Sequence, residues 1–349
     1  MRAERTTPAK SRYLRRIVTL GACAALLAGC SEASSGDSAA PAKSARAQAH
    51  VCAQVDGAEV GTQKGDAVCE AYALGGAGNK ASADADGEGS TAGAVAGSLA
   101  LFDKGKSKLT GDNNTSMAAA TDGAGALARS GVNDEGRTGA TGNTAVARAD
   151  HPKAFANASA ANGNYNSATS VADGCIGTPE NACSFSASGN GDHNIASADS
   201  DGKDSVAQAG ALDGDRNRAF SKSRSGGRAS GSAQGGDGNS ADSLAMGLAA
   251  FASTQATGGD SFALARAEGP KSTANAVARL AAVARALASL GATATATATG
   301  KGFTAYAFAS GAGTTASATH DADTDTGSCS GPGVAFAMTG GTFRCVQGF

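Results

Sequence analysis

The chain has 349 residues and a formal net charge of −2, and although 41% of its residues are hydrophobic it has no Trp, 4 Tyr and 11 Phe. Most of the apolar residues are Ala, and 50 residues are Gly, about twice the ordinary share. This composition excludes a conventional core of large side chains, and the near-zero charge gives no electrostatic support for binding nucleic acid.

Residues 1–29 have the features of an export signal. Six basic residues precede an apolar run, Ile17 to Gly29, that is too short to span a bilayer. The run ends in "LLAGC", which resembles the lipobox of bacterial lipoproteins. The resemblance implies cleavage before Cys30 and a thioether-linked diacylglycerol on that cysteine, as in palmitate-bearing lipoproteins. The expected partner is then the cell membrane, and the lipid on Cys30 would anchor the chain to its extracytoplasmic face.

The chain that follows begins with a tether. Residues 30–50 contain no large apolar side chain and read as a flexible segment. Loss of residues 1–29 removes six basic residues and one acidic residue, leaving 23 Lys and Arg against 30 Asp and Glu, a formal charge of −7. Two alternatives to the lipoprotein signal stay open: an ordinary secretory signal with a chance cysteine, and twin-arginine export suggested by Arg15 and Arg16.

Residues 51–315 consist of repeated units that begin with glycine. The pattern appears as "GNYNSA" from Gly163, "GDHNIA" from Gly191, "GDRNRA" from Gly214 and "GDGNSA" from Gly236, and "GDSFAL" from 259 keeps only its start. A repeat of about 23 residues, built from half-units of about 11–12, is typical of a solenoid. Gly supplies a bend, and Asp beside it favours a turn. The aspartates assigned to this role are Asp192, Asp215, Asp237 and Asp260.

Between the turns, Ala alternates with other residues, as at Ala196 and Ala198 and in "ATATATATG" from 292 to 300. A period of two places Ala on one face of an extended strand. Ala is a poor strand former, so its use predicts strands that approach too closely for larger side chains. Residues 272–290 leave two alternatives, because the alternation continues through them while Val277, Leu280 and Leu287 also lie at helical spacing.

The cysteines predict closed ends. Cys23 leaves with the signal and Cys30 takes the lipid, so six remain in three local couples: Cys52 with Cys69, Cys175 with Cys183, and Cys329 with Cys345. An exported chain meets an oxidising compartment, which favours disulfides. Zinc is disfavoured because the sequence has no CxxC or HxxxH spacing. The first couple would close the first coil, and the last would lie in a C-terminal cap at 316–349 that protects the open strand edges.

The predicted fold is therefore an all-β, short-rung β-solenoid with an interior of Ala, Ser and Gly and with disulfide-closed ends. The pattern of Gly-Asp/Asn and Ala-x-Ala from about 75 to 315 resembles the head repeats of trimeric autotransporter adhesins, and this resemblance implies a β-solenoid. The SVAIG-type core motif of those repeats is missing from this sequence. "VCAQ…GDAVCEAYA" and "CSGPGVAFAMTGGTFRC" resemble uncharacterised secreted proteins and lipoproteins of actinobacteria. Neither resemblance implies a catalytic residue.

Few residues suggest chemistry. His193 lies among four aspartates, but its position is occupied by Tyr165, Arg216 and Gly238 in the other repeats, which predicts a solvent-facing turn. "HDADTDTG" from His320 has alternate aspartates, yet lacks the Gly and carboxylate positions of a calcium loop. Hydrolase and phosphate-loop motifs are absent from the sequence. We therefore expect no enzyme, no cofactor, no metal and no catalytic residue.

The function expected is a membrane-anchored, surface-exposed structural or interaction lipoprotein, either adhesin-like or an envelope spacer. The alternative is a largely disordered Ala/Gly/Ser-rich spacer, ordered only at its disulfide loops. Two further hypotheses are ice binding through a flat threonine array such as "TATATAT" and weak calcium binding by the solenoid.

Overall fold

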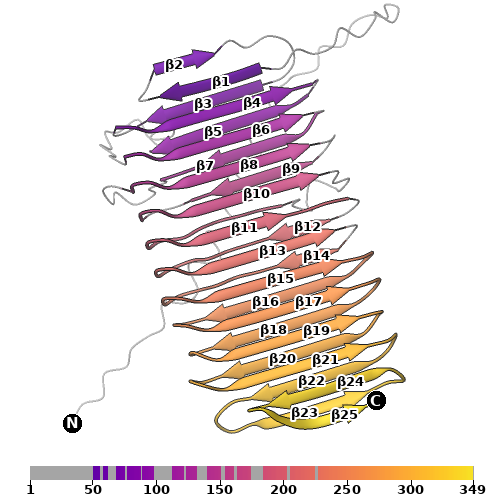
Figure 1. The fold of residues 1–349 in the computed structure, drawn as a ribbon. Helices are drawn as coiled ribbons and strands as arrows, with labels where there is room; N and C mark the ends of the chain where they lie inside the picture. Colours follow the sequence, from indigo (N-terminus) through magenta and orange to yellow (C-terminus); the bar gives the residue numbers. More distant parts are fainter. Residues whose placement is uncertain are drawn as a thin grey trace, which may run out of the picture. The chain divides into compact units, whose positions relative to one another are not determined.

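The computed structural model describes residues 50–55, 58–61, 68–74, 77–87, 89–97, 112–121, 123–131, 140–150, 154–160, 163–173, 184–202, 205–224 and 227–348. Its strands belong to the compact unit Arg46–Phe349. The described residues form strands and turns without a helix, and none of them makes a helix long and apolar enough to cross a membrane. The fold is a β-solenoid of about nine turns, in which each turn contributes one strand to each of two facing layers (Figure 1).

One layer is a 14-stranded sheet that runs through the whole unit. Its strands, in their order across the sheet, are β2 (Ala58–Gly61), β1 (His50–Val55), β4 (Lys80–Asp86), β6 (Thr115–Thr121), β8 (Thr144–Asp150), β10 (Ser167–Asp173), β11 (Ile195–Asp199), β13 (Arg218–Arg224), β15 (Ser240–Met246), β17 (Phe262–Glu268), β19 (Val283–Ser289), β21 (Thr304–Ser310), β24 (Val334–Thr339) and β25 (Thr342–Gln347).

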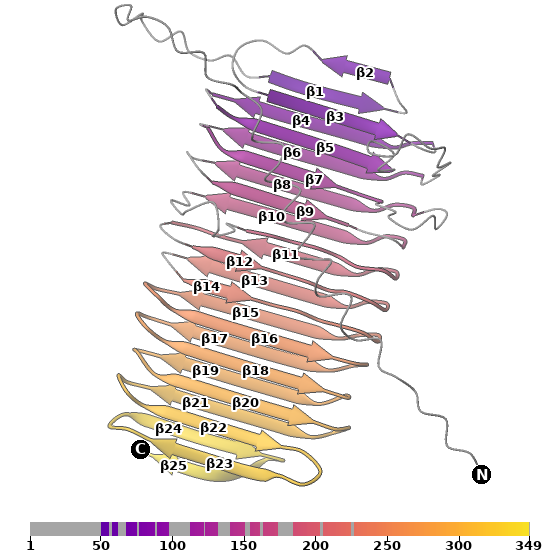
Figure 2. The same cartoon turned by 180° about the vertical axis from the view of Figure 1, so that it is seen from behind.

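The other layer is divided into two sheets, and Figure 2 gives the view from behind. The four-stranded sheet contains β3 (Val68–Leu74), β5 (Thr91–Gly97), β7 (Gly125–Arg129) and β9 (Phe155–Ser159). The seven-stranded sheet contains β12 (Val206–Gln208), β14 (Arg228–Ser230), β16 (Phe251–Thr257), β18 (Thr273–Arg279), β20 (Thr293–Thr299), β22 (Thr315–His320) and β23 (Asp325–Ser330). Isolated bridges from Phe185 to Asn157 and to Gln208 link the two sheets.

The repeat in the sequence corresponds to one full turn of the solenoid. Ser240 pairs with Arg218 on one side and with Phe262 on the other, each 22 residues away, and the strands are parallel and in register. Equivalent positions of successive repeats therefore lie in rows across the sheet. The half-unit of the repeat is one strand with its turn.

Alanine fills the space between the layers. Along β17, β18 and β20 every second residue is Ala and is fully buried, while the residues between point outward. The buried alanines of both layers join in one cluster from Ala229 to Ala337. The interior is thus as narrow as the alternation predicts. In the middle of the unit the Ala rows are interrupted by buried serines, including Ser170, Ser186 and Ser221.

The helical alternative for residues 272–290 is wrong, because this segment forms β18 and β19. Ala274, Ala276 and Ala278 are all fully buried on one side of β18, whereas a helix would spread alternate residues around its axis. Leu280 and Ala281 turn the chain between the strands with φ of 58° and 60°, in the left-handed region that a right-handed helix does not use. Closure of the Ala interior outweighs local helix propensity here.

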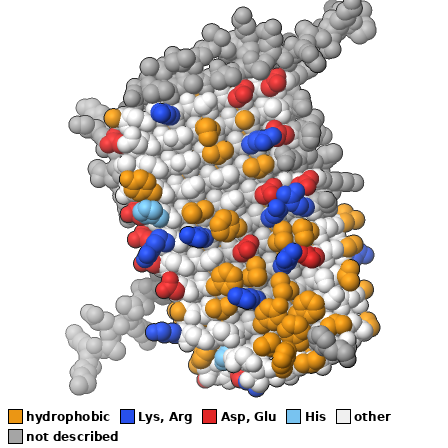
Figure 3. Space-filling model, viewed as in Figure 1, with side chains coloured by type: hydrophobic (Ala, Val, Ile, Leu, Met, Phe, Trp, Pro, Cys, Tyr) orange, Lys and Arg blue, Asp and Glu red, His pale blue; other side chains and the backbone are white. Residues whose placement is uncertain are grey.

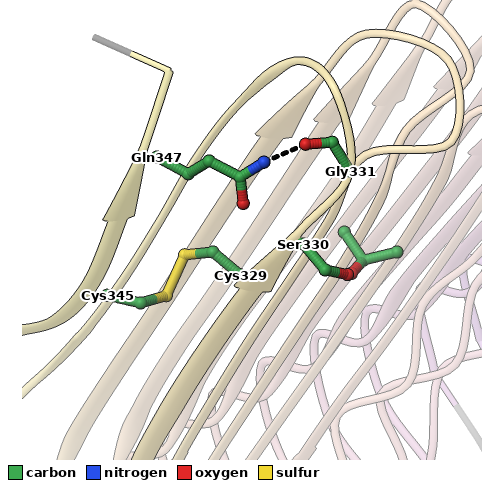
Figure 4. The surroundings of a disulfide bond; sticks show 6 residues. Cys329, Ser330, Gly331, Cys345 and Gln347 are labelled. Carbon is green, nitrogen blue, oxygen red and sulfur yellow. Dashed lines mark hydrogen bonds between the residues drawn. A yellow bond between two sulfur atoms is a disulfide. The ribbon is translucent and has the colours of Figure 1, made fainter.

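The parallel stacking ends in antiparallel strands at the C-terminal end. β23 pairs with β22, β24 with β21, and β25 with β24, all antiparallel. The disulfide predicted for Cys329 and Cys345 is formed and joins β23 to β25, and therefore one layer to the other. Gln347 donates a hydrogen bond from its side-chain amide to the carbonyl of Gly331 beside it (Figure 4). Both cysteines pack against the end of the Ala cluster.

The other cysteines are described only in part. Cys69 is disulfide-bonded, and it lies on β3. Cys52 lies on β1, but its side chain is outside the described part of the chain, as are Cys175 and Cys183. The export signal, Cys30 and nearly all of the tether are also outside the described residues. At the N-terminal end of the 14-stranded sheet, β1 pairs antiparallel with both β2 and β4.

Candidate interaction faces

The asparagine that ends each "GDxN" unit has a structural role that the sequence did not reveal. Asn194, Asn217 and Asn239 are fully buried at one edge of the interior. The backbone N–H of Asn217 donates to Oδ1 of Asn194 at 2.9 Å, and the N–H of Asn239 donates to Oδ1 of Asn217 at 2.9 Å. The same contact links earlier turns from Asn79 onward and ends at Ser261. We call this row the asparagine ladder, and it satisfies backbone donors that would otherwise be buried without a partner.

The position before each asparagine is the turn position of His193. His193, Tyr165 and Arg216 are exposed there, with φ between 56° and 60°. The rings of Tyr165 and His193 stack with their centroids 5.3 Å apart. The prediction that His193 faces solvent is thus confirmed. The role of this position is a left-handed bend, at a cost of about 1 kcal/mol for a residue with a Cβ.

The aspartates of the repeat bond to a neighbouring turn. Oδ1 of Asp215 accepts the backbone N–H of Asp192 at 2.8 Å, and Oδ1 of Asp237 accepts that of Asp215 at 2.9 Å. These side chains therefore join successive turns in addition to favouring their own bend. Asp260 also lies at a bend, but it occupies the left-handed position of Arg216 rather than the position of Asp237. Its N–H donates to the carbonyl of Asp237 and its φ is 55°, because Ser261 occupies the asparagine position and shifts the unit by one residue.

The aspartates of "HDADTDTG" form a hairpin turn between β22 and β23. Oδ1 of Asp321 accepts the backbone N–H groups of Asp323 and Thr324 at 2.9 and 2.7 Å. Asp325 instead accepts hydrogen bonds from Thr339 and Arg344. The bond from Thr339, with the Arg344 charge nearby, holds the pKa of Asp325 below its ordinary value. In the described part of the chain, no three His, Cys, Asp or Glu side chains are grouped closely enough to hold a metal ion.

An apolar patch covers the outer face of the 14-stranded sheet near its C-terminal end. Figure 3 shows hydrophobic side chains gathered there, with a few charged ones between them. The patch is formed by Phe262, Leu264, Leu287, Tyr306, Phe308 and Phe336, all half-buried. The Phe336 ring stacks on Tyr306 and on Phe308, with centroids 5.3 and 5.2 Å apart. These side chains come from four different strands and meet because the strands are in register.

A shallow open groove continues from this patch toward β11. Phe220, Leu244, Leu264 and Leu287 line it together with charged side chains, among them Asp242. Burial raises the pKa of Asp242, and the positive charge of Arg266 partly opposes the shift. Asp242 makes no hydrogen bond or ion pair with a described residue. The groove therefore combines apolar walls with one unpaired, half-buried carboxylate.

The opposite layer carries a different outer surface at the same end. Its outward side chains on β18, β20, β22 and β23 are mostly Thr and Ser, and we call this surface the hydroxyl face. It consists of Thr273, Asn275, Thr293, Thr295, Thr297, Thr299, Thr315, Ser317, Thr319, Thr326, Ser328 and Ser330. Val277 lies beside Thr297 within this face, and Arg279 lies beside Thr299 at its edge. The threonines of "TATATAT" stand outward along β20 within this face.

Sequence reasoning missed the apolar patch. Each of its strands shows an ordinary alternation with one or two large side chains, and nothing within a strand marks them as neighbours. The missing information was the register of about 22 residues, which places Leu287 beside Phe308 and puts Leu264 in the row of Arg285 and Tyr306. Applying that register to the outward residues could have found the patch.

Compared with family models, curated proteins and solved structures, the chain matches none.

Proposed function

We propose that this chain is a membrane-anchored, surface-exposed lipoprotein without catalysis, whose solenoid makes an adhesin-like contact through the apolar patch. The lipobox-like "LLAGC" supports an anchor at Cys30. The resemblance to lipoproteins of actinobacteria, and the likeness of the repeats to autotransporter head repeats, support a position outside the membrane. The narrow Ala interior supports a role for the outer faces rather than for an internal site.

The main support for an adhesin-like contact is the apolar patch. A spacer needs only length, and charged or polar side chains serve its outer surface best. On the 14-stranded sheet, Leu264, Leu287 and Phe308 instead stand outward together, and contiguous exposed apolar surface marks interaction sites. This favours the interaction role over the envelope spacer. The alternative of a largely disordered spacer does not agree with strands that extend from β3 to β25.

The contact is tested by adhesion of cells that carry the full chain to an alkyl-coated surface. The variant is Leu264→Asp with Leu287→Asp, which places charge in the patch but leaves the Ala interior unchanged. The matched control is Thr295→Asp with Thr297→Asp on the opposite layer. We expect the patch variant to adhere no better than cells without the protein, and the control to adhere like the wild type. Equal adhesion of all three would contradict the proposal.

The anchor is tested separately by replacing Cys30. In the wild type, labelled fatty acid should be incorporated and the chain should sediment with membranes. Cys30→Ala should take up no label and should be released into the soluble fraction. If the wild type incorporates no fatty acid, or if Cys30→Ala remains with the membranes, the lipid anchor is wrong.

A further inference from the structure

The hydroxyl face has a regularity that a contact with a protein or a lipid does not require. Thr293, Thr295, Thr297 and Thr299 stand outward along the whole of β20. Across the strands, Thr293 lies between Thr273 and Thr315 in one row. The pairing of β20 with β18 and with β22 has no register shift. The result is a two-dimensional array of hydroxyl and methyl groups that is continuous on β20 and β22, while β18 adds Thr273, Asn275 and Val277 at its border.

This array is free to bind water. The four threonine hydroxyls of β20 make no hydrogen bond with any described residue. On the neighbouring strand β22, the hydroxyl of Thr315 makes a hydrogen bond with the hydroxyl of Ser330. Arg279, at the end of β18, is the one charged side chain among the outward residues of β18, β20 and β22. Charge would organise water around itself, so its near-absence leaves the repeat of the hydroxyls to set the water structure.

The array is also rigid. Threonine is stiff at χ1 because it is branched at Cβ, and Ala294, Ala296 and Ala298 beneath β20 are fully buried in the close-packed interior. Hydroxyls repeat at about 6.6 Å along a strand and about 4.8 Å between strands, and these spacings are comparable with repeats of the oxygen lattice in ice. A rigid surface loses little conformational entropy when it orders a ligand.

From this geometry we propose that the hydroxyl face binds ice. The ligand is the ordered water lattice of a growing crystal, which the threonine hydroxyls would join by hydrogen bonds while their methyl groups sit against it. The face covers roughly 400 Å² by ordinary strand spacings. Because that area is small, we expect the activity to appear as slowed ice recrystallisation with a small gap between melting and freezing.

The experiment uses the full chain with Cys30→Ala, so that it can be studied without detergent, and follows grain growth in a polycrystalline ice film. The variant is Thr295→Lys with Thr297→Lys, and Thr295→Val with Thr297→Val tests the hydroxyls while keeping the shape. The control is Leu264→Asp with Leu287→Asp on the other layer. Circular dichroism before the assay establishes that each variant has kept its strands.

The unsubstituted chain and the Leu264/Leu287 control should slow grain growth, the lysine variant should lose the effect, and the valine variant should weaken it. Grain growth that the unsubstituted chain does not slow would overturn the proposal. A folded lysine variant with full activity would overturn it too, because another surface would then be responsible. Because the Leu264/Leu287 variant should lose adhesion but still slow grain growth, either proposal can fail while the other stands.

Discussion

At the scale of single residues, some buried polar side chains of the interior have a hydrogen-bond partner among the described residues and others do not. Ser221 and Ser243 are neighbours in one row of the 14-stranded sheet, between Ala198 and Ala265. Both are buried. Ser243 donates its hydroxyl to the carbonyl of Ser230, whereas the hydroxyl of Ser221 has no hydrogen-bond partner among the described residues. We therefore expect the two serine hydroxyls, one turn apart, to have opposite effects on the stability of the fold.

Ser221→Ala should stabilise the protein. The change removes a buried hydroxyl without a partner and restores the Ala of the row, and we expect the free energy of unfolding to rise by about 1 kcal/mol. Ser243→Ala is the matched control and should lower it, because the carbonyl of Ser230 then loses its donor. The midpoints of urea denaturation measure both. A lower midpoint for Ser221→Ala would mean that its hydroxyl has a partner in solution.

Asp242 should make stability depend on pH. Burial raises the pKa of its carboxyl group above its ordinary value of 3.8, so the folded state holds the proton more tightly than the unfolded state does. Ionised Asp242 therefore destabilises the fold at neutral pH, and this cost disappears as pH falls through the raised pKa to below 3.8. Asp242→Asn should be more stable than the wild type at pH 7 and equal to it at pH 3. Denaturant midpoints at both values give the comparison, and a difference that does not change with pH would contradict it.

At the scale of the elements, the turns are joined to one another more firmly than local turn preferences suggest. The asparagine ladder connects the start of one strand to the start of the next in the 14-stranded sheet, and the aspartate row connects the bends. The strand registers continue the same connection. Each turn is therefore stabilised mainly by its neighbours, as in other repeat proteins.

Asn217→Ala should weaken this connection. Oδ1 of Asn217 accepts both the backbone N–H and the side-chain amide of Asn239, at 2.9 and 3.0 Å. Its loss leaves a buried N–H without an acceptor, and we expect a loss of about 2 kcal/mol in the free energy of unfolding. Asn217→Ser should cost less, because the hydroxyl of Ser261, which occupies an asparagine position, accepts the backbone N–H of Ala281 on the next turn.

The control for this prediction is the next position in the bend. Arg216→Gly leaves the asparagine ladder intact and relieves a residue with φ of 59°, so thermal unfolding should not occur at a lower temperature. If Asn217→Ala and Arg216→Gly had the same unfolding temperature, the ladder would contribute nothing measurable.

At the scale of the whole folded unit, the C-terminal end is where the repeat stops. β24 and β25 follow the last parallel strand of one layer, and β23 follows that of the other, all in the antiparallel sense. The Cys329–Cys345 disulfide, with a separation of 16 residues, joins the two layers at this end. Gly327 must lack a side chain there, since a Cβ would lie 2.9 Å from that of Ala337 and 2.5 Å from that of Arg344.

Breaking the disulfide should release the end of the solenoid first. A loop of this length is worth about 3 kcal/mol in the chain-entropy model. In Cys345→Ser we expect faster amide hydrogen exchange in β23 and β25 than in β17 or β18, and self-association as the strand edges beneath become exposed. Hydrogen exchange with mass spectrometry and light scattering measure the two effects. Uniformly faster exchange along the whole solenoid would show that the end does not open separately.

The sequence by itself determined the repeat, the all-β class, the Ala interior and the Cys329–Cys345 pairing. These follow from local patterns: a period of two along each strand, Gly at the bends, and two cysteines close in the chain. The position of His193 on an exposed turn could also be read from its substitutes in other repeats, Tyr165 and Arg216.

The tertiary structure alone decided what lies beside what. Register brings Leu264, Leu287 and Phe308 together on one layer and Thr273, Thr293 and Thr315 into a row on the other. It also decided between helix and strand at 272–290, because local propensity favoured both and only burial of Ala on neighbouring turns separates them. The reason is physical: a strand fixes which of its residues face outward, but hydrogen bonds to residues about 22 positions away fix their neighbours.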